Sequence, residues 1–177
     1  MSDAAPVSGI HHLKIVVSDL HASLSWWQDV TGARRDSDLD HRTADGQLFA
    51  YLVEVPGVSP YLELRLDPAA AKAVAGLDPI TFAVDTRDDL VQLGARLDGL
   101  GIEHSPVLRG LVGWILVVRT PDGLSVRFHT RESHEWDPQN ADSSSPWINP
   151  PRRPGYLHSV NPPGGSQAEM QPRVAGR

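Results

Sequence analysis

The chain repeats one order of predicted secondary structure, and this repeat limits the folds it can adopt. Over residues 9–67 a strand, a helix and further strands are predicted, in HLKIVV, DLHASLSWWQDVTG, QLFAYLVEV and PYLELRL. The same order returns over residues 78–130, in ITFAV, the helical segment 85–100, a short strand near IEHSPV, WILVVR and LSVRFHT. The sequence therefore predicts an α+β fold of two βαβββ modules.

Three segments carry weaker signals. The stretch RRDSDLDHRTADG is mostly polar, so we expect it to be mobile, and one strand of the first module is poorly marked. Residues 1–8 are expected to be a flexible N-terminus. Residues 131–177 are rich in Pro, Gly, Ser and Asn, which predicts an irregular tail that Trp136, Trp147 and Tyr156 could pin to the body of the protein.

The repeat can be put in register. Aligning LKIVV with ITFAV places His12 opposite Pro79, and aligning LELRL with VRFHT places Glu63 opposite Arg127. Side chains alternate along a strand, so His12, Glu63 and Arg127 are predicted on the faces opposite their apolar neighbours. These positions are the candidate site.

Composition excludes several function classes. There are 0 cysteines, which excludes disulfides, thiolate metal sites and a cysteine nucleophile, and the net charge of −6 argues against non-specific nucleic-acid binding. No apolar run approaches the roughly 20 residues of a membrane span. We expect a cytoplasmic protein with no nucleic-acid or membrane partner.

The chain resembles the vicinal oxygen chelate superfamily of glyoxalases, extradiol dioxygenases, fosfomycin-resistance enzymes and bleomycin-resistance proteins. The likeness covers about residues 9–130 and rests on HHLKIVVSDLHASLSWWQDVTGARR, YLELRL, LDPITFAVDTRDDLVQLGARLDGLGIEHSPV and GWILVVRTPDGLSVRF. It implies that the modules form an incomplete barrel around a cleft, that a small organic molecule binds there, and that the protein pairs as a homodimer.

Metal-dependent members of that superfamily hold one divalent ion with a residue on the first strand and another on the last strand of each module. His12 and Glu63 match this pattern, whereas Pro79 and Arg127 do not. A proline ring has no lone pair to offer and a guanidinium repels a cation. The resemblance thus implies a degenerate metal site with no cofactor; the alternative is a divalent Fe, Mn, Zn or Ni ion on the shifted set His12, Glu63 and His129, or with His104 as a replacement.

Without a metal, Glu63 and Arg127 are predicted to pair directly, and such a pair could simply fill the barrel floor. If the cleft binds a ligand, as drug-sequestering members do, the predicted ligand-binding residues are Lys14, Tyr61, Arg65, Trp114 and His129, with Lys14 and Arg65 suited to an anion. His11 is expected to face the helix side.

A catalytic alternative uses the same cleft for proton transfer. His12 would be the acid or base, Glu63 would orient it, and Arg127 would stabilise a developing anion, as in an isomerase, cyclase or lyase. A metal-dependent dioxygenase or glyoxalase with shifted ligands is the third alternative. The superfamily also suggests a role in antibiotic biosynthesis or resistance.

Overall fold

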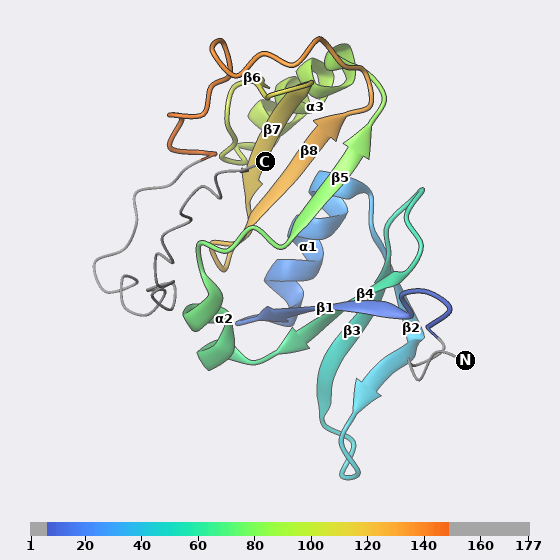
Figure 1. Cartoon of the computed structure of the whole chain (residues 1–177). Coiled ribbons are helices and arrows are strands. Elements are labelled where there is room, and N and C mark those ends of the chain that lie inside the picture. Colours follow the sequence, from blue (N-terminus) through green and yellow to red (C-terminus); the bar gives the residue numbers. More distant parts are fainter. Residues whose placement is uncertain (1–6, 149–177) are drawn as a thin grey trace, which may run out of the picture.

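The computed structural model describes residues 7–148 of the chain, and it consists of two modules with the same topology (Figure 1). The first module contains β1 (His12–Val17), α1 (Leu20–Thr31), β2 (Arg34–Arg42), β3 (Leu48–Glu54) and β4 (Tyr61–Leu66). A short helix, α2 (Pro68–Val74), links it to the second module, which contains β5 (Ile80–Val84), α3 (Arg87–Leu100), β6 (Leu108–Arg109), β7 (Trp114–Arg119) and β8 (Ser125–Thr130).

Each module forms one open four-stranded sheet. The strand orders are β1-β4-β3-β2 and β5-β8-β7-β6, with the first and last strands of each module parallel and the other pairs antiparallel. β1 pairs Lys14 with Glu63, and β5 pairs Thr81 with Arg127. The predicted α+β fold of paired βαβββ modules is therefore confirmed, and so is the register that makes Glu63 the counterpart of Arg127.

The first helix begins and ends where the sequence indicates, and the second ends as predicted but begins at Arg87 instead of residue 85. The carboxylate of Asp19 accepts hydrogen bonds from the first backbone N–H groups of α1, and Gly32 ends this helix in the left-handed conformation at φ 71°. Thr86 and Asp89 form a capping box at the start of α3. Local sequence thus fixes where both helices end, while packing of their apolar faces in the core stabilises them.

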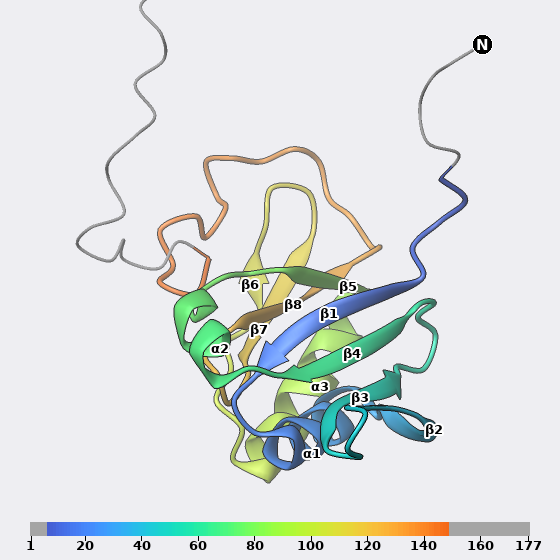
Figure 2. The ribbon, with the colours of Figure 1, turned by 90° about the horizontal axis from the view of Figure 1, so that it is seen from below.

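One apolar core joins the two modules. Residues of α1 and β1 pack in the same cluster as residues of α3, β7 and β8, and the ring of Trp27 meets Phe82 edge to face at 6.2 Å between centroids. Arg96 of α3 also donates hydrogen bonds to the carbonyl oxygens of Asp29 and Val30 at the end of α1. Figure 2 shows α1 and α3 on the same side of the two sheets.

The polar stretch after α1 departs from expectation. Residues 34–42 form β2, which pairs with β3 through an irregular register, and the TADG turn that follows has Gly46 at φ 87°. The prediction of a mobile segment was therefore wrong. Backbone pairing with the apolar strand β3 orders this segment even though its own side chains are polar.

Residues 131–148, here called the C-terminal strap, contain no helix or strand. The strap runs on the side of the second sheet opposite α3 (Figure 2). The carboxylate of Asp142 accepts a hydrogen bond from the backbone N–H of Arg109 at 2.6 Å, and the Trp147 ring lies under the guanidinium of Arg119 at 4.9 Å. Trp136 is exposed, and Tyr156 lies outside the described residues.

Within residues 7–148 no helix combines the length and the apolar character needed to cross a bilayer.

Candidate functional site

The candidate site is built around Glu63 in the middle of the first sheet. Lys14 on β1 and Leu52 on β3 are its direct cross-strand neighbours, so their side chains share its face. Leu62 and Leu64, on either side of Glu63, point the other way into the core. Strand alternation therefore directs this carboxylate away from the helices.

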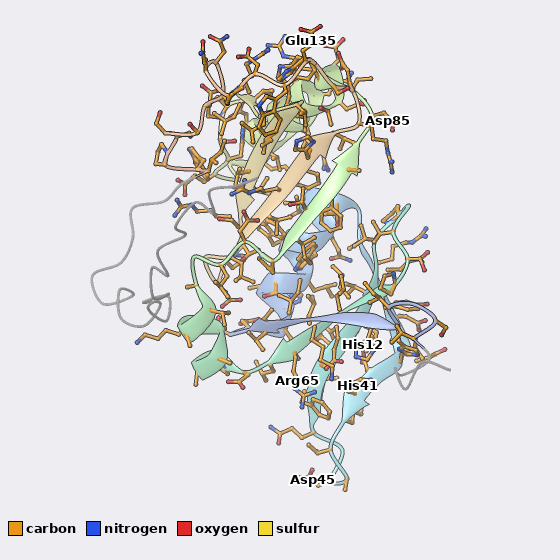
Figure 3. The ribbon with its side chains drawn as sticks, viewed as in Figure 1. His12, His41, Asp45, Arg65, Asp85 and Glu135 are labelled. Carbon is orange, nitrogen blue, oxygen red and sulfur yellow. The ribbon has the colours of Figure 1, made fainter. Side chains whose placement is uncertain are left out.

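Glu63 is fully buried, at 0% exposed, and is surrounded by groups that are or can become cations. Its oxygens lie near His12 Nε2 at 3.2 Å, Lys14 Nζ at 3.4 Å, Arg65 Nη1 at 3.1 Å and His41 Nδ1 at 3.8 Å. Arg65 donates a hydrogen bond to Oε1, whereas Oε2 has neighbours at ion-pair distance but no well-oriented hydrogen bond. Figure 3 shows His12, His41 and Arg65 gathered at one place on the first sheet.

These neighbours keep Glu63 ionised. Burial by itself raises the pKa of the carboxyl, but the hydrogen bond from Arg65 and the charges of Lys14 and His41 outweigh it, so the pKa lies below its ordinary value. The carboxylate is therefore a permanent negative charge at neutral pH.

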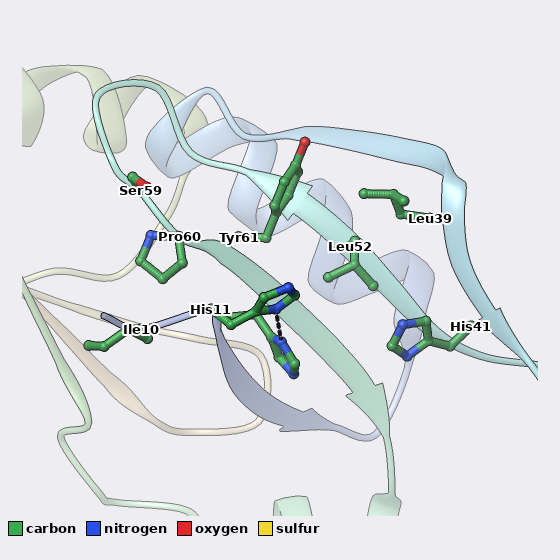
Figure 4. A pocket seen from close by; sticks show the side chains of 9 residues that line it. Ile10, His11, Leu39, His41, Leu52, Ser59, Pro60 and Tyr61 are labelled. Atoms are coloured by element: carbon green, nitrogen blue, oxygen red, sulfur yellow. Dashed lines mark hydrogen bonds between the residues drawn. The ribbon is translucent and has the colours of Figure 1, made fainter. Parts of the chain in front are cut away.

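A pocket of about 580 Å³ opens beside this group (Figure 4). Most of its lining is apolar or aromatic, and the polar part comes from histidines and a serine; the lining residues are Ile10, His11, His12, Leu39, His41, Leu52, Ser59, Pro60 and Tyr61. Its size and mixed lining suit a small organic molecule.

His11 belongs to this pocket, which corrects the expectation that it faces the helix side. Its Nδ1 lies 2.9 Å from Nδ1 of His12, and the two rings meet edge to face (Figure 4). The alternation rule failed because β1 begins only at His12, so His11 precedes the regular strand. Glu63, His12 and His11 consequently form a continuous chain of polar contacts.

His41 is a site residue that the sequence pattern did not indicate. It reaches Glu63 from β2, and its ring also packs against Phe49 at 5.7 Å between centroids. The TADG turn was a usable signal, because a turn before the strand QLFAYLVEV implies a partner strand on its other side.

Arg127 does not join Glu63, so the predicted direct ion pair was wrong. The Arg127 guanidinium instead pairs with Asp78 and donates a hydrogen bond to the carbonyl oxygen of Ile148 at 3.2 Å. Burial raises the pKa of the Asp78 carboxyl, and Arg127 offsets only part of this effect. The equivalent positions of the two modules therefore carry separate charge pairs.

The predicted ligand-binding residues do not all lie in one module. Lys14, Arg65 and Tyr61 lie on the first sheet beside the pocket. Trp114 lies in the second module, where its ring meets the His134 ring edge to face at 5.1 Å between centroids. His129, also in the second module, forms a hydrogen bond through Nδ1 with the carbonyl oxygen of Thr130.

His104 is held elsewhere in the second module. Its ring nitrogens contact Asp98 of α3 and the carbonyl oxygen of Ser105. It therefore makes local contacts close to the end of α3.

The side chains do not fit the four-ligand metal site that the resemblance describes. Lys14 and Arg65 occupy positions against the Glu63 oxygens, and Pro79 and Arg127 supply no donor from the second module. Among residues 7–148 no three His, Asp or Glu side chains are arranged to hold a metal ion. The shifted set with His129 is not assembled in the described part of the chain.

The sequence profile of the glyoxalase/bleomycin resistance protein/dioxygenase superfamily matches residues 9–128. The chain belongs to this superfamily. No curated protein matches the chain in sequence.

Solved structures share the fold of this superfamily member. A glyoxylase/bleomycin resistance protein/dioxygenase domain from Frankia sp. EAN1pec is 24% identical with a TM-score of 0.57, covering 70% of this chain and 98% of that one. The antibiotic binding protein TnmS3 from Streptomyces sp. CB03234 is 17% identical with a TM-score of 0.57, covering 72% and 98%.

A third structure holds a metal. A point mutant of the fosfomycin resistance protein FosX from Listeria monocytogenes, solved with Mn(II) and a dihydroxypropylphosphonic acid, is 18% identical with a TM-score of 0.52, covering 70% and 92%. At these identities the three structures establish the fold alone.

Proposed function

We propose that this superfamily member binds a small organic molecule in the pocket of its first module and uses no metal ion to do so. The observation that carries the proposal is the pocket of about 580 Å³, whose apolar walls end at the two histidines that contact buried Glu63. A preformed apolar pocket with a few converging polar groups is the usual form of a small-molecule site.

The metal-free part of the proposal is supported by charge. A divalent ion at Glu63 would meet the ammonium of Lys14 and the guanidinium of Arg65, which lie 3.4 and 3.1 Å from the carboxylate oxygens. Like charges this close disfavour metal binding. Elemental analysis of protein purified without chelator tests this point, because one Fe, Mn, Zn or Ni ion retained per chain would refute it.

The binding part can be tested with a neutral apolar probe, N-phenyl-1-naphthylamine, whose fluorescence rises in apolar surroundings. Leu39 lines the pocket and is 44% exposed, so Leu39→Trp should fill the pocket without disturbing the core. Val91 is 50% exposed on α3, which makes Val91→Trp a matched control.

We expect the wild type and Val91→Trp to bind the probe and Leu39→Trp to lose at least about tenfold in affinity. Equal binding by all three proteins would show that the pocket is not the site.

A second candidate function, proton transfer, is favoured by the contact chain of Glu63, His12 and His11. Only one of two facing Nδ1 atoms can carry the bonding proton. If His12 directs an Nε2–H toward Glu63, its Nδ1 accepts from His11 Nδ1, and His11 Nε2 remains as a free acceptor at the pocket. This arrangement suits an isomerase, cyclase or lyase in which Arg127 takes no part.

Solvent exchange separates catalysis from binding. A panel of keto acids incubated with the protein in D₂O and followed by proton NMR would report exchange at the carbon next to the carbonyl. Exchange that disappears in His11→Ala and His12→Ala, with probe binding retained, supports the enzyme. Absence of exchange with the wild type across the panel counts against it.

A further inference from the structure

The group around Glu63 contains more positive charge than the carboxylate can balance. Lys14 and Arg65 are permanent cations at neutral pH, so together with the single charge of Glu63 they leave an excess of one positive charge before either histidine is protonated. The Lys14 and Arg65 side chains remain 52% and 43% exposed. Their charged ends are therefore available to a second, diffusible anion.

Neighbouring carboxylates do not neutralise this excess positive charge. Asp40, on the same strand as His41, is 4% exposed and is bound by Arg35 and Arg42. Asp36 pairs with Leu52 across β2 and β3, which puts two strand spacings, roughly 10 Å, between it and Glu63. Among the described residues Lys14 and Arg65 form their ion pairs with Glu63. At a separation close to the Debye length at physiological salt, Asp36 offsets their charge only weakly.

The cations continue the pocket along the same sheet face. His12 lines the pocket, and Lys14 lies two residues further along β1 with its side chain on the same side. Arg65 has the same relation to Glu63 on β4, and its guanidinium lies 5.0 Å from the centre of the Phe49 ring. Glu63 and Phe49 therefore hold Arg65 in a fixed direction.

We infer that the ligand is an organic anion whose apolar part occupies the pocket and whose carboxylate, phosphonate, phosphate or sulfonate group contacts Lys14 and Arg65. This inference rests on the proposed function and adds the chemical class of the ligand. Glu63 is the positioning residue, because it holds the two cations at one place and is itself too buried to meet the ligand. Guanidinium and ammonium groups are the side chains that proteins use to bind such oxyanions.

Two probes that differ by one charge test the inference. 1-Anilinonaphthalene-8-sulfonate carries the ring system of N-phenyl-1-naphthylamine with an added sulfonate, so a comparison of their affinities isolates the anion. Lys14→Gln is the principal variant, because Lys14 is half exposed and Arg65 still donates to Glu63 without it. Arg65→Gln is the second variant, and Lys72→Gln on exposed α2 is the control for total charge.

We expect Lys14→Gln and Arg65→Gln each to weaken the sulfonate probe about tenfold and to change the neutral probe by less than about twofold, with both probes unaffected by Lys72→Gln. Near-UV circular dichroism of each variant establishes that it is folded. Sulfonate binding that is unchanged in both site variants would overturn the inference.

The pocket variant distinguishes this failure from failure of the proposed function. If Leu39→Trp abolishes binding of both probes while Lys14→Gln changes neither, the pocket is the site and the anionic class is wrong. If Leu39→Trp leaves both probes bound, the proposed function itself fails and the inference falls with it.

Discussion

The substitution Glu63→Gln tests whether one buried carboxylate holds the site together. Gln has nearly the same shape, so the change removes the negative charge and leaves the packing intact. Lys14 and Arg65 then face each other across a neutral amide, with their ends 52% and 43% exposed. Water can therefore solvate them in part once the carboxylate is gone.

The loss of stability expected for Glu63→Gln lies between two limits. Breaking a fully buried ion pair costs about 3–5 kcal/mol, and breaking an exposed pair costs about 0–1 kcal/mol. Because Glu63 is buried but its partners are half exposed, we expect a loss of about 1–2 kcal/mol in the free energy of unfolding. For a chain of this size that lowers the melting temperature by about 2–8 °C.

The stabilisation that Glu63 contributes depends on pH. The pKa of Glu63 is lower in the folded protein than in the unfolded chain. Its stabilisation is therefore present above the ordinary glutamate pKa of about 4.3 and is lost as the pH falls through the lower folded value. The difference in stability between wild type and Glu63→Gln should be constant near neutral pH and shrink in acid.

Urea denaturation of both proteins from pH 7 down to the acid limit of folding measures this difference. Glu54→Gln is the matched control, because Glu54 pairs with Arg34 on the surface and should change stability by less than about 0.5 kcal/mol. A Glu63→Gln protein as stable as the wild type at pH 7 would refute the view that this carboxylate balances its cations.

Two further predictions concern the fold. Thr86→Ala removes the hydroxyl that accepts from Asp89 N at 3.2 Å in the capping box, and it should cost about 1 kcal/mol by urea denaturation. Trp27→Ala removes a side chain that is 1% exposed and contacts Phe82 of the other module, so it should cost about 3–5 kcal/mol and still unfold both modules in one transition. Val91→Ala, at an exposed position of α3, is the control for both. Two separate transitions in Trp27→Ala would contradict the shared core.

The fold could be predicted because its signals are local and occur twice. Strand alternation in LKIVV and ITFAV, the cap at Asp19 and the stop at Gly32 each act within a few residues. The strand β2 was not recognised because residues 34–42 are mostly polar and show no apolar alternation, and only pairing with β3 makes them a strand. A bulged register of this kind depends on the partner strand and is not visible in the segment itself.

The site was only partly predictable for a related reason. His12, Lys14, Glu63 and Arg65 follow from alternation and register, and the structure places all four together. The ion-pair partner of Arg127 could not be predicted from alternation and register. Register fixes where a side chain starts, but a long guanidinium side chain pairs with the nearest acid in space, which is Asp78.

The C-terminal strap lies on the sheet of the second module, whereas the pocket of the first module is open. The carbonyl oxygen of Ile148 accepts a hydrogen bond from Arg127, and the Trp147 ring lies under the guanidinium of Arg119. A covalently tethered segment therefore already lies against charged groups of the second sheet. A tethered segment acts at an effective concentration on the order of millimolar, whatever the concentration of the protein. A diffusing molecule would have to compete with that segment at the second module but meets an open pocket at the first. Titration should therefore give one ligand for each chain, although the backbone offers the same plan twice.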